Sequence, residues 1–221
     1  MTIKAVIFDM DGVLIEAKEW HYEALNQALG LFGFGISRQD HEHRFDGLPT
    51  RTKLLTLSQE CGLPVALHGF IGRMKQKYTA ELARANLQPN PLHTYALRTL
   101  RADGYRIGVA SNSIRGTIDL MMSLAGLTPF LDFILSNEDV KQPKPSPEIY
   151  LKGMSLLDVA PHECLVLEDN PFGWQAATEA GAHLLKIGTV HEVNYGNIRR
   201  VVQAVESRAR VDDLESFPKV A

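Results

Sequence analysis

Two aspartates, one residue apart, follow a short apolar run near the amino terminus. The run is Ala5 to Phe8, and Asp9, Asp11 and Gly12 come after it. Consecutive apolar residues predict a strand that is buried on both faces, and the glycine permits the chain to turn away. Two carboxylates this close raise each other's pKa unless a cation neutralises them. One interpretation is a divalent metal site with oxygen ligands suited to Mg²⁺, and the other is a polar turn after a core strand.

Other polar residues stand where later elements of the chain end or begin. They are Ser111 and Asn112, Lys144 in a proline-rich loop, and Glu168 with Asp169. Each has a simpler explanation when taken alone: a helix cap, a solvated lysine, or favourable acidic charge before a helix. Open α/β sheets bind their ligands at the carboxyl ends of the strands, so these side chains could meet there.

Together these residue types provide the chemistry of phosphoryl transfer. A carboxylate such as Asp9 can attack phosphorus and form an acyl phosphate that water then cleaves. Asp11 is placed to protonate the leaving oxygen and later to accept a proton from water, a role worth about 10²–10⁴-fold in rate. Mg²⁺ held by Asp9 and Asp169 would neutralise the phosphoryl oxygens, helped by Lys144 and a hydrogen bond from Ser111.

Strands and helices alternate in the second part of the chain. We predict helices over 92–102, 117–124, 147–157, 172–180 and 198–207, and strands over 106–110, 130–135, 164–167 and 183–187. This alternation predicts an α/β fold, a Rossmann-like parallel sheet with helices on both faces. The residues from Val211 onward are expected to fray, although Leu214 and Phe217 could dock.

A helical pattern occupies the segment between the first strand and this alternating region. Apolar residues recur at helical spacing over 20–29, 54–57 and 70–82, and a proline-containing stretch over 86–91 follows them. We therefore predict an α/β core domain formed by residues 1–14 and 88–221, with a small helical cap domain, residues 15–87, inserted after the first strand.

The composition and net charge of the chain indicate which classes of binding partner to expect. The chain has 221 residues, 45% of them hydrophobic and 22% charged, which is ordinary for a globular protein. A net charge of -3 argues against nucleic acid or an anionic membrane surface as the main partner. Cys61 and Cys164 lie far apart and indicate reduced thiols, and no stretch is typical of a secretion signal or a membrane span. We expect a cytoplasmic protein that acts on a small phosphorylated substrate, and nothing demands more than a monomer.

The sequence resembles the haloacid dehalogenase-like hydrolases, in the branch with a small helical cap that contains phosphoglycolate-type phosphatases and β-phosphoglucomutase. The resemblance extends from Ile3 to about Ile187 and rests on motifs that occur in the family's order. They are Val6-Ile7-Phe8-Asp9-Met10-Asp11-Gly12-Val13, Val109-Ala110-Ser111-Asn112, Lys144-Pro145-Ser146-Pro147-Glu148-Ile149-Tyr150, and Leu167-Glu168-Asp169-Asn170 with Gly173 following. A lone Asp-x-Asp pair is a weak signal, but these motifs at consistent spacing are a strong one.

The resemblance implies a role for each core residue. Asp9 matches the aspartyl nucleophile and a metal ligand, and Asp11 matches the general acid/base that also gives its backbone carbonyl to the metal. Ser111 and Asn112 match the phosphate-binding pair, and Lys144 matches the lysine that bridges nucleophile and phosphate. The presence of the second aspartate points to phosphate esters, because members that act on carbon–halogen or phosphonate bonds lack it.

The last motif supplies acidic residues for the metal. Asp169 matches the acidic metal ligand of the family, and Glu168 either binds the metal or supports Asp169. The cofactor that the resemblance implies is Mg²⁺.

The inserted helices resemble the cap that closes over the site, excludes water and selects the substrate. His21 falls where mutase-like members have a histidine near the acid/base aspartate, and its alternative is a half-exposed helix histidine. Arg51 resembles the cap arginine that binds a second anionic group of the substrate, if the alignment is adjusted by one residue. Lys75 is a weaker candidate, interpreted as a solvated charge.

The function predicted first is a Mg²⁺-dependent phosphatase that hydrolyses a small phosphorylated metabolite, preferably a sugar phosphate, through an aspartyl-phosphate intermediate. The alternative is a phosphosugar mutase similar to β-phosphoglucomutase, which would use the same core with a cap that keeps water away. A phosphate-binding or regulatory protein without turnover is disfavoured, because all the catalytic side chains are intact.

Overall fold

The core domain is built on a five-stranded sheet in the order β3-β2-β1-β4-β5, and all neighbouring strands are parallel. The computed structural model describes residues 2–215, and side chains as far as residue 207. The strands are β1 (Ala5–Phe8), β2 (Arg106–Ala110), β3 (Phe133–Leu135), β4 (Cys164–Glu168) and β5 (His183–Lys186). The central position of β1 places the loop that follows it in the middle of the sheet's carboxyl edge.

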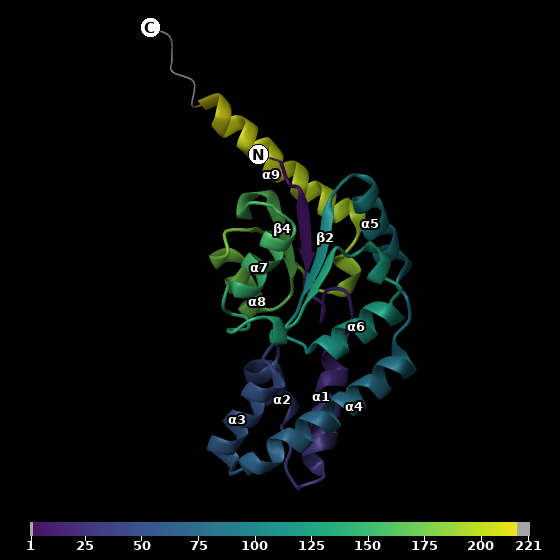
Figure 1. Ribbon diagram of the computed structural model, residues 1–221, viewed down its shortest axis with the longest axis vertical. Coiled ribbons are helices and arrows are strands. Elements are labelled where there is room, and N and C mark those ends of the chain that lie inside the picture. Colours follow the sequence, from purple (N-terminus) through teal and green to yellow (C-terminus); the bar gives the residue numbers. More distant parts are fainter. Residues whose placement is uncertain (1, 216–221) are drawn as a thin grey trace.

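Helices cover both faces of this sheet (Figure 1). One face packs against α5 (Pro91–Ala102), α6 (Arg115–Leu124) and α9 (Tyr195–Glu215), and the other against α7 (Glu148–Leu156) and α8 (Pro171–Glu179). Side chains of β1 alternate between the two apolar clusters: Val6 and Phe8 lie in the first, Ala5 and Ile7 in the second, all fully buried. The predicted Rossmann-like α/β fold is therefore confirmed.

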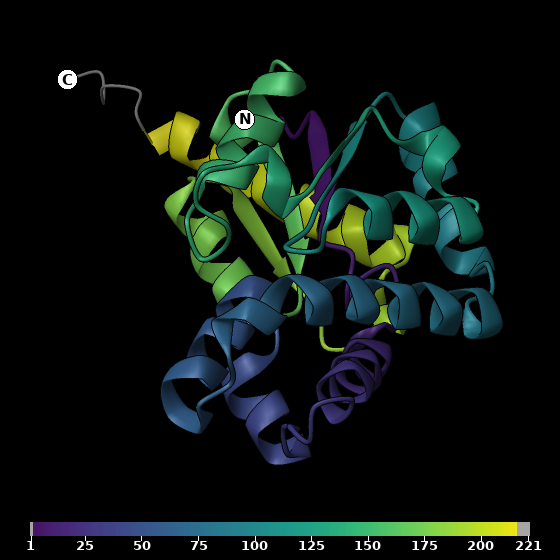
Figure 2. The ribbon, with the colours of Figure 1, turned by 60° about the horizontal axis from the view of Figure 1, so that its bottom comes forward.

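A separate group of helices lies beyond the carboxyl ends of the strands (Figures 1 and 2). It consists of α1 (Lys18–Gly30), α2 (Arg38–Asp40), α3 (Thr50–Cys61) and α4 (His68–Asn86), with a π-helical turn over His41–Phe45. These helices have an apolar cluster of their own that includes Leu25, Leu54 and Ile71. This arrangement is that of a helical cap, and we keep residues 15–87 as the predicted bounds of that domain. Within the described residues, no helix is both long and apolar enough to cross a membrane.

Several element boundaries differ from the sequence-based expectation. Strand β3 begins at Phe133 instead of residue 130, because Thr128–Phe130 form a 3₁₀ turn that contains a proline. Helix α6 begins two residues before residue 117, and α9 begins three residues before residue 198. The side-chain docking expected of Leu214 and Phe217 lies outside the side chains that the structure describes.

Two glycines allow backbone to approach the carboxylates at the sheet edge. Gly12 has a φ of +83°, and a Cβ there would overlap the Asp169 side chain. Gly173, in the first turn of α8, leaves room for the Glu168 carboxylate, which a Cβ would likewise overlap. The loop after β1 and the start of α8 can therefore close tightly around Glu168 and Asp169.

Candidate active site

A cavity of about 600 Å³ lies between the sheet edge and the cap. Every candidate site residue predicted from the sequence lines it: Asp9, Asp11, His21, Arg51, Ser111, Asn112, Lys144, Glu168 and Asp169. The segments that follow β1, β2, β3 and β4 supply the core side, and α1, α3 and α4 contribute from the cap. The topology thus brings together residues that are widely separated in the sequence.

Lys144 is buried and lines this cavity on its core side. Its Nζ donates hydrogen bonds to Asp9 Oδ1 at 2.7 Å, Glu168 Oε1 at 2.5 Å and the Ala110 carbonyl at 2.8 Å. Only 4% of the residue is exposed, so the alternative of a solvated loop lysine is wrong. Burial lowers the pKa of Lys144, but the carboxylates of Asp9 and Glu168 outweigh it and hold that pKa above its ordinary value.

Glu168 is held in place from several directions. Its Oε1 also accepts a hydrogen bond from the Tyr150 hydroxyl at 2.7 Å, and its Oε2 accepts from the backbone N–H of Asp169 at 3.1 Å. Its backbone carbonyl accepts from Trp174 Nε1 at 3.1 Å. Tyr150 was part of a motif but had no predicted role, and the structure shows that it orients this buried glutamate.

The carboxylates of Asp9, Glu168 and Asp169 form an acidic cluster, with one oxygen of each within 4.8 Å of the others. Burial raises the pKa of Asp9 well above its ordinary value, against the opposing charge of Lys144. Burial also raises the pKa of Asp169 to about 6. The raised pKa values indicate that the neighbouring positive charge does not balance the three carboxylates when they are ionised. Their hard oxygen donors fit a divalent cation such as Mg²⁺.

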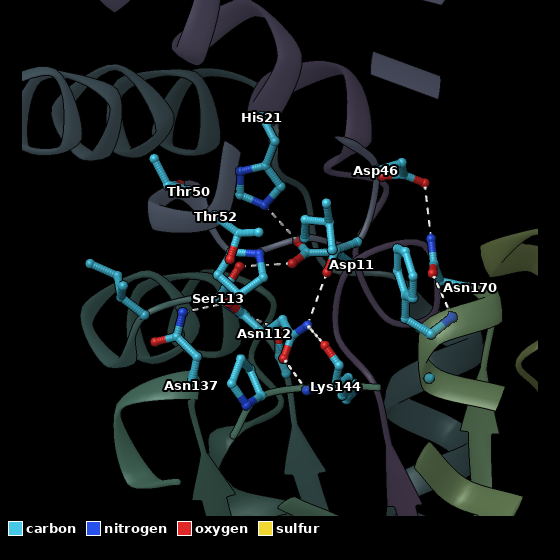
Figure 3. A pocket seen from close by; sticks show the side chains of 18 of the residues that line it. Asp11, His21, Asp46, Thr50, Thr52, Asn112, Ser113, Asn137, Lys144 and Asn170 are labelled. Carbon is cyan, nitrogen blue, oxygen red and sulfur yellow. Dashed lines mark hydrogen bonds and ion pairs between the residues drawn. The ribbon is translucent and has the colours of Figure 1, made fainter. Parts of the chain in front are cut away.

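Lys18, the first residue of α1, connects the cap to this cluster. Its Nζ lies 2.6 Å from Asp169 Oδ2 in the core and 3.5 Å from Asp46 Oδ2 in the cap. Asp46 in turn accepts a hydrogen bond from Asn170 Nδ2 at 3.3 Å (Figure 3). Sequence reasoning missed Lys18, because it belongs to no motif and only the packing of cap on core brings it to Asp169.

Asp11 is contacted by both the cap and the core (Figure 3). His21 Nε2 lies 2.9 Å from Asp11 Oδ1, and Ser113 Oγ donates to Asp11 Oδ2 at 2.9 Å. Lys75 Nζ lies 2.9 Å from His21 Nδ1. Because the ionised Asp11 carboxylate only accepts hydrogen bonds, the ring proton sits on Nε2 and points to Asp11, and Nδ1 accepts from Lys75.

His21 and Lys75 are both more buried than the sequence predicts. The His21 side chain is 13% exposed, which differs from a half-exposed helix histidine. Lys75 is 6% exposed, so its interpretation as a solvated charge is wrong. Burial lowers the pKa of Lys75 to about 7. Burial also acts to raise the pKa of Asp11, but the hydrogen bonds from His21 and Ser113 outweigh it, and the net direction is downward.

Ser111 and Asn112 form hydrogen bonds with loops of the core, and Asn112 also forms one with the cap. Ser111 is buried, and its Oγ accepts from the Ser113 N–H at 3.0 Å. Asn112 Nδ2 donates to the Gly47 carbonyl of the cap at 2.9 Å, and its Oδ1 accepts from the Lys144 N–H at 3.0 Å. The residue at the cap position of α6 is Ile114, without a side-chain hydrogen bond, so the helix-cap alternative for this pair is wrong.

Arg51 lies in the first turn of α3 and lines the cavity with an exposed side chain. No hydrogen bond or ion pair joins its guanidinium to another residue in the described part of the chain. Its role in binding a second anionic group stays a prediction.

Replacing Lys144 with methionine should lower the free energy of unfolding by about 3–5 kcal/mol, because the change leaves two buried carboxylates without their cation. Urea denaturation followed by circular dichroism measures this effect. Lys77→Met is the matched control, since the Lys77 side chain is 63% exposed and, among the described residues, forms an ion pair with Glu81 alone. Equal midpoints for the two variants would contradict the structural role assigned to Lys144.

Comparisons with known proteins agree with this geometry. The family model described as haloacid dehalogenase-like hydrolase matches residues 6–187. A phosphorylated carbohydrates phosphatase of Thermotoga maritima is 30% identical over 197 residues, which cover 88% of each chain. β-Phosphoglucomutase from Clostridium difficile superposes with a TM-score of 0.80 at 21% identity, covering 92% of this chain and 98% of that one.

CbbY from Rhodobacter sphaeroides, solved in complex with phosphate, is similar with a TM-score of 0.74 at 25% identity, covering 83% of this chain and 85% of that one. The match of the family model spans both the cap and the loops after the strands that carry Asp9, Ser111, Lys144 and Asp169. The predicted enzyme class, a phosphatase-type hydrolase, is confirmed. The chain therefore belongs to the haloacid dehalogenase-like hydrolase family.

Proposed function

We propose that the protein is a Mg²⁺-dependent phosphatase that hydrolyses a small phosphorylated metabolite, preferably a sugar phosphate, through an aspartyl phosphate on Asp9. The observation that carries this proposal is the buried Lys144 ammonium, which holds Asp9 at the floor of a cavity that Asp11 also lines. The relative named as a phosphatase of phosphorylated carbohydrates supports the substrate class. A cytoplasmic location and a monomeric state complete the proposal.

In the first step, a carboxylate oxygen of Asp9 attacks phosphorus while the bond from phosphorus to the ester oxygen breaks. Lys144 keeps Asp9 oriented and offsets charge on the phosphoryl oxygens, and Ser111 and backbone N–H groups donate hydrogen bonds to them. Asp11 gives its proton to the leaving oxygen. Asp11 has a lowered pKa before substrate binds, and the negative charge of an arriving phosphate raises that pKa and favours the acid form.

In the second step, water attacks the phosphorus of the aspartyl phosphate. Asp11, now ionised, accepts the proton of that water, and the acyl–phosphate bond breaks to release phosphate and regenerate the Asp9 carboxylate. His21 holds the Asp11 carboxylate through the proton on Nε2, and Ser113 fixes its other oxygen. The closed cap would limit which water molecules reach this carboxylate.

The residues that would hold Mg²⁺ are Asp9, Asp169 and the backbone carbonyl of Asp11, with Glu168 as a direct ligand or a support. The bound cation supplies charge neutralisation that allows an anionic nucleophile and an anionic phosphate to approach each other. The Lys18 ammonium at 2.6 Å already neutralises part of the Asp169 charge in this arrangement.

Removing divalent cations should abolish turnover. We expect phosphate release from at least one member of a panel of sugar phosphates, phosphoglycolate and nucleotides, and a loss of roughly 10²-fold or more in EDTA, restored by excess Mg²⁺. Release that continues unchanged in EDTA would contradict the Mg²⁺ requirement. If no panel member released phosphate, the result would contradict the phosphatase proposal, and the mutase would be tested next.

The second candidate function is a phosphosugar mutase. The hydrogen-bonded series from Lys75 through His21 to Asp11 favours it, because a cap residue that contacts the acid/base can couple its position to cap closure. A mutase would convert a hexose 1-phosphate to the 6-phosphate in the presence of a bisphosphate primer, with little phosphate released. Phosphate release without isomerisation would support the phosphatase.

A further inference from the structure

Two lysines contact the acidic cluster, and they come from different domains. Lys144, in the core, contacts Asp9 and Glu168. Lys18, the first residue of α1 in the cap, contacts Asp169 at 2.6 Å. The Lys144 side chain is 4% exposed, whereas that of Lys18 is 40% exposed. Lys144 is therefore enclosed, but Lys18 can leave the cluster while its ammonium stays in water.

The Lys18 side chain occupies space beside the residues that would hold Mg²⁺. A Cβ placed on Gly12 would lie 2.1 Å from Asp169 Oδ2 and 2.8 Å from Lys18 Cε, so both side chains lie against the loop after β1. The Asp11 carbonyl, a proposed metal ligand, belongs to the same loop. A divalent cation at the cluster and the Lys18 ammonium would therefore share one carboxylate, and their like charges would repel each other.

Lys18 has a second carboxylate within reach in its own domain. Asp46 Oδ2 lies 3.5 Å from Lys18 Nζ, and the Asp46 side chain is 24% exposed. Asn170 Nδ2 donates a hydrogen bond to the same oxygen, which keeps Asp46 beside the core (Figure 3). If a metal ion takes up the charge of Asp169, Lys18 can therefore keep an ion pair within the cap.

The ion pair between Lys18 and Asp169 joins the cap to the core. Of the ion pairs found among the described side chains, only this one and that of His21 with Asp11 cross from one domain to the other. A cation bound by Asp169 would therefore weaken one of the two charged contacts that hold the cap on the core.

We propose that Lys18 competes with Mg²⁺ for the charge of Asp169, so that it lowers the metal affinity of the site and couples metal binding to the position of the cap. This proposal rests on the proposed function, which assigns Mg²⁺ to Asp9 and Asp169. Coupling of this kind is reciprocal, so Mg²⁺ must weaken the contact of Lys18 with Asp169 as much as that contact weakens Mg²⁺ binding. Lys18 thus helps to set the Mg²⁺ concentration at which the cap is released from Asp169.

Calorimetric titration with magnesium chloride, without substrate, tests the competition. Lys18→Met removes the charge and keeps most of the length of the side chain, so the Kd for Mg²⁺ should fall roughly 10-fold. Lys18→Arg keeps the charge and should bind Mg²⁺ about as weakly as the wild type. Lys77→Met removes an exposed charge of the cap and should leave the Kd unchanged. A Kd that is unchanged or higher in Lys18→Met would overturn the proposal.

Asp46→Asn tests whether Lys18 is shared between the two carboxylates. Without the Asp46 carboxylate, Lys18 is left to Asp169 alone, and the Kd for Mg²⁺ should rise roughly 3-fold. The same substitution in the Lys18→Met background should change the Kd far less. An equal effect in both backgrounds would show that Asp46 acts on the cation directly, and it would overturn the exchange of Lys18 between Asp169 and Asp46.

Amide hydrogen exchange measures the coupling to the cap. Saturating Mg²⁺ should speed the exchange of α1 amides in the wild type, because the contact of Lys18 with the core is weakened, and it should have little effect in Lys18→Met. Unchanged exchange in the wild type would contradict the coupling.

Phosphate release with Mg²⁺ distinguishes this proposal from the proposed function. Tighter Mg²⁺ binding in Lys18→Met, with no phosphate released by the wild type from any panel substrate, would support the competition and contradict the phosphatase. Equal Kd values for the wild type and Lys18→Met, with Mg²⁺-dependent release by both, would overturn the competition and leave the phosphatase standing.

Discussion

Replacing Asp9 with asparagine should lower phosphate release by at least about 10⁴-fold, because an amide cannot form the acyl phosphate. The asparagine side chain keeps an oxygen that can accept the hydrogen bond that Lys144 Nζ donates to Asp9 Oδ1 at 2.7 Å. The variant should therefore retain the packing around Lys144. Steady-state phosphate release with Mg²⁺ measures the loss. Mass spectrometry of acid-quenched enzyme should show a phosphate adduct on the wild type and none on the variant.

Asp119→Asn is the matched control for this substitution. Asp119 has a side chain that is 49% exposed, on α6, where it pairs with Arg115. Its variant should retain full activity, since exposed pairs of this kind contribute little. Asp9→Asn activity within tenfold of the wild type would show that another group attacks phosphorus.

Replacing Asp11 with asparagine should lower turnover of alkyl phosphates by about 10²–10⁴-fold, because an amide can neither give nor accept the transferred proton. The effect should depend on the leaving group. With p-nitrophenyl phosphate, whose leaving group needs no proton, aspartyl-phosphate formation should remain fast and its hydrolysis should become slow. Rapid mixing should then show a burst of nitrophenol equal to the enzyme concentration.

Ser113→Ala separates the proton-transfer role of Asp11 from its orientation. This variant removes the hydrogen bond of 2.9 Å to Asp11 Oδ2 but leaves a titratable carboxyl. It should lose less than the asparagine variant and show no burst. Equal losses for both esters in Asp11→Asn, without a burst, would argue that Asp11 acts only by positioning.

The core half of the site could be predicted because parallel strands end at a common edge. Asp9, Ser111 and Glu168 each follow or end an apolar run, and the register of β1 with β2 and β4 makes them neighbours. The chemistry expected of those residues needed no knowledge of side-chain direction. The lengths of the strands were less predictable, since a 3₁₀ turn shortened β3.

The cap half could be predicted only in outline. Helical periodicity indicates which residues share a face, but it does not show that the face meets another domain. Lys75 illustrates this: it lies four residues after Ile71 and four before Thr79, within the buried stripe of α4. That spacing was visible in the sequence and would have placed Lys75 inside. Lys18 had no comparable signal, because its surroundings depend on how cap and core meet.

The hydrogen bond from Trp174 Nε1 to the Glu168 carbonyl places an indole against the backbone of a residue of the acidic cluster. The ring also lies 4.1 Å from Lys186 Nζ, measured to its centroid. The chain has only two tryptophans, and the other, Trp20, belongs to α1 of the cap. Indole emission responds to the local electric field, so each half of the molecule contains its own intrinsic fluorophore. Changes beside the acidic cluster or at the first turn of α1 should therefore alter the fluorescence of the unlabelled protein, and Trp20→Phe leaves only the signal of Trp174.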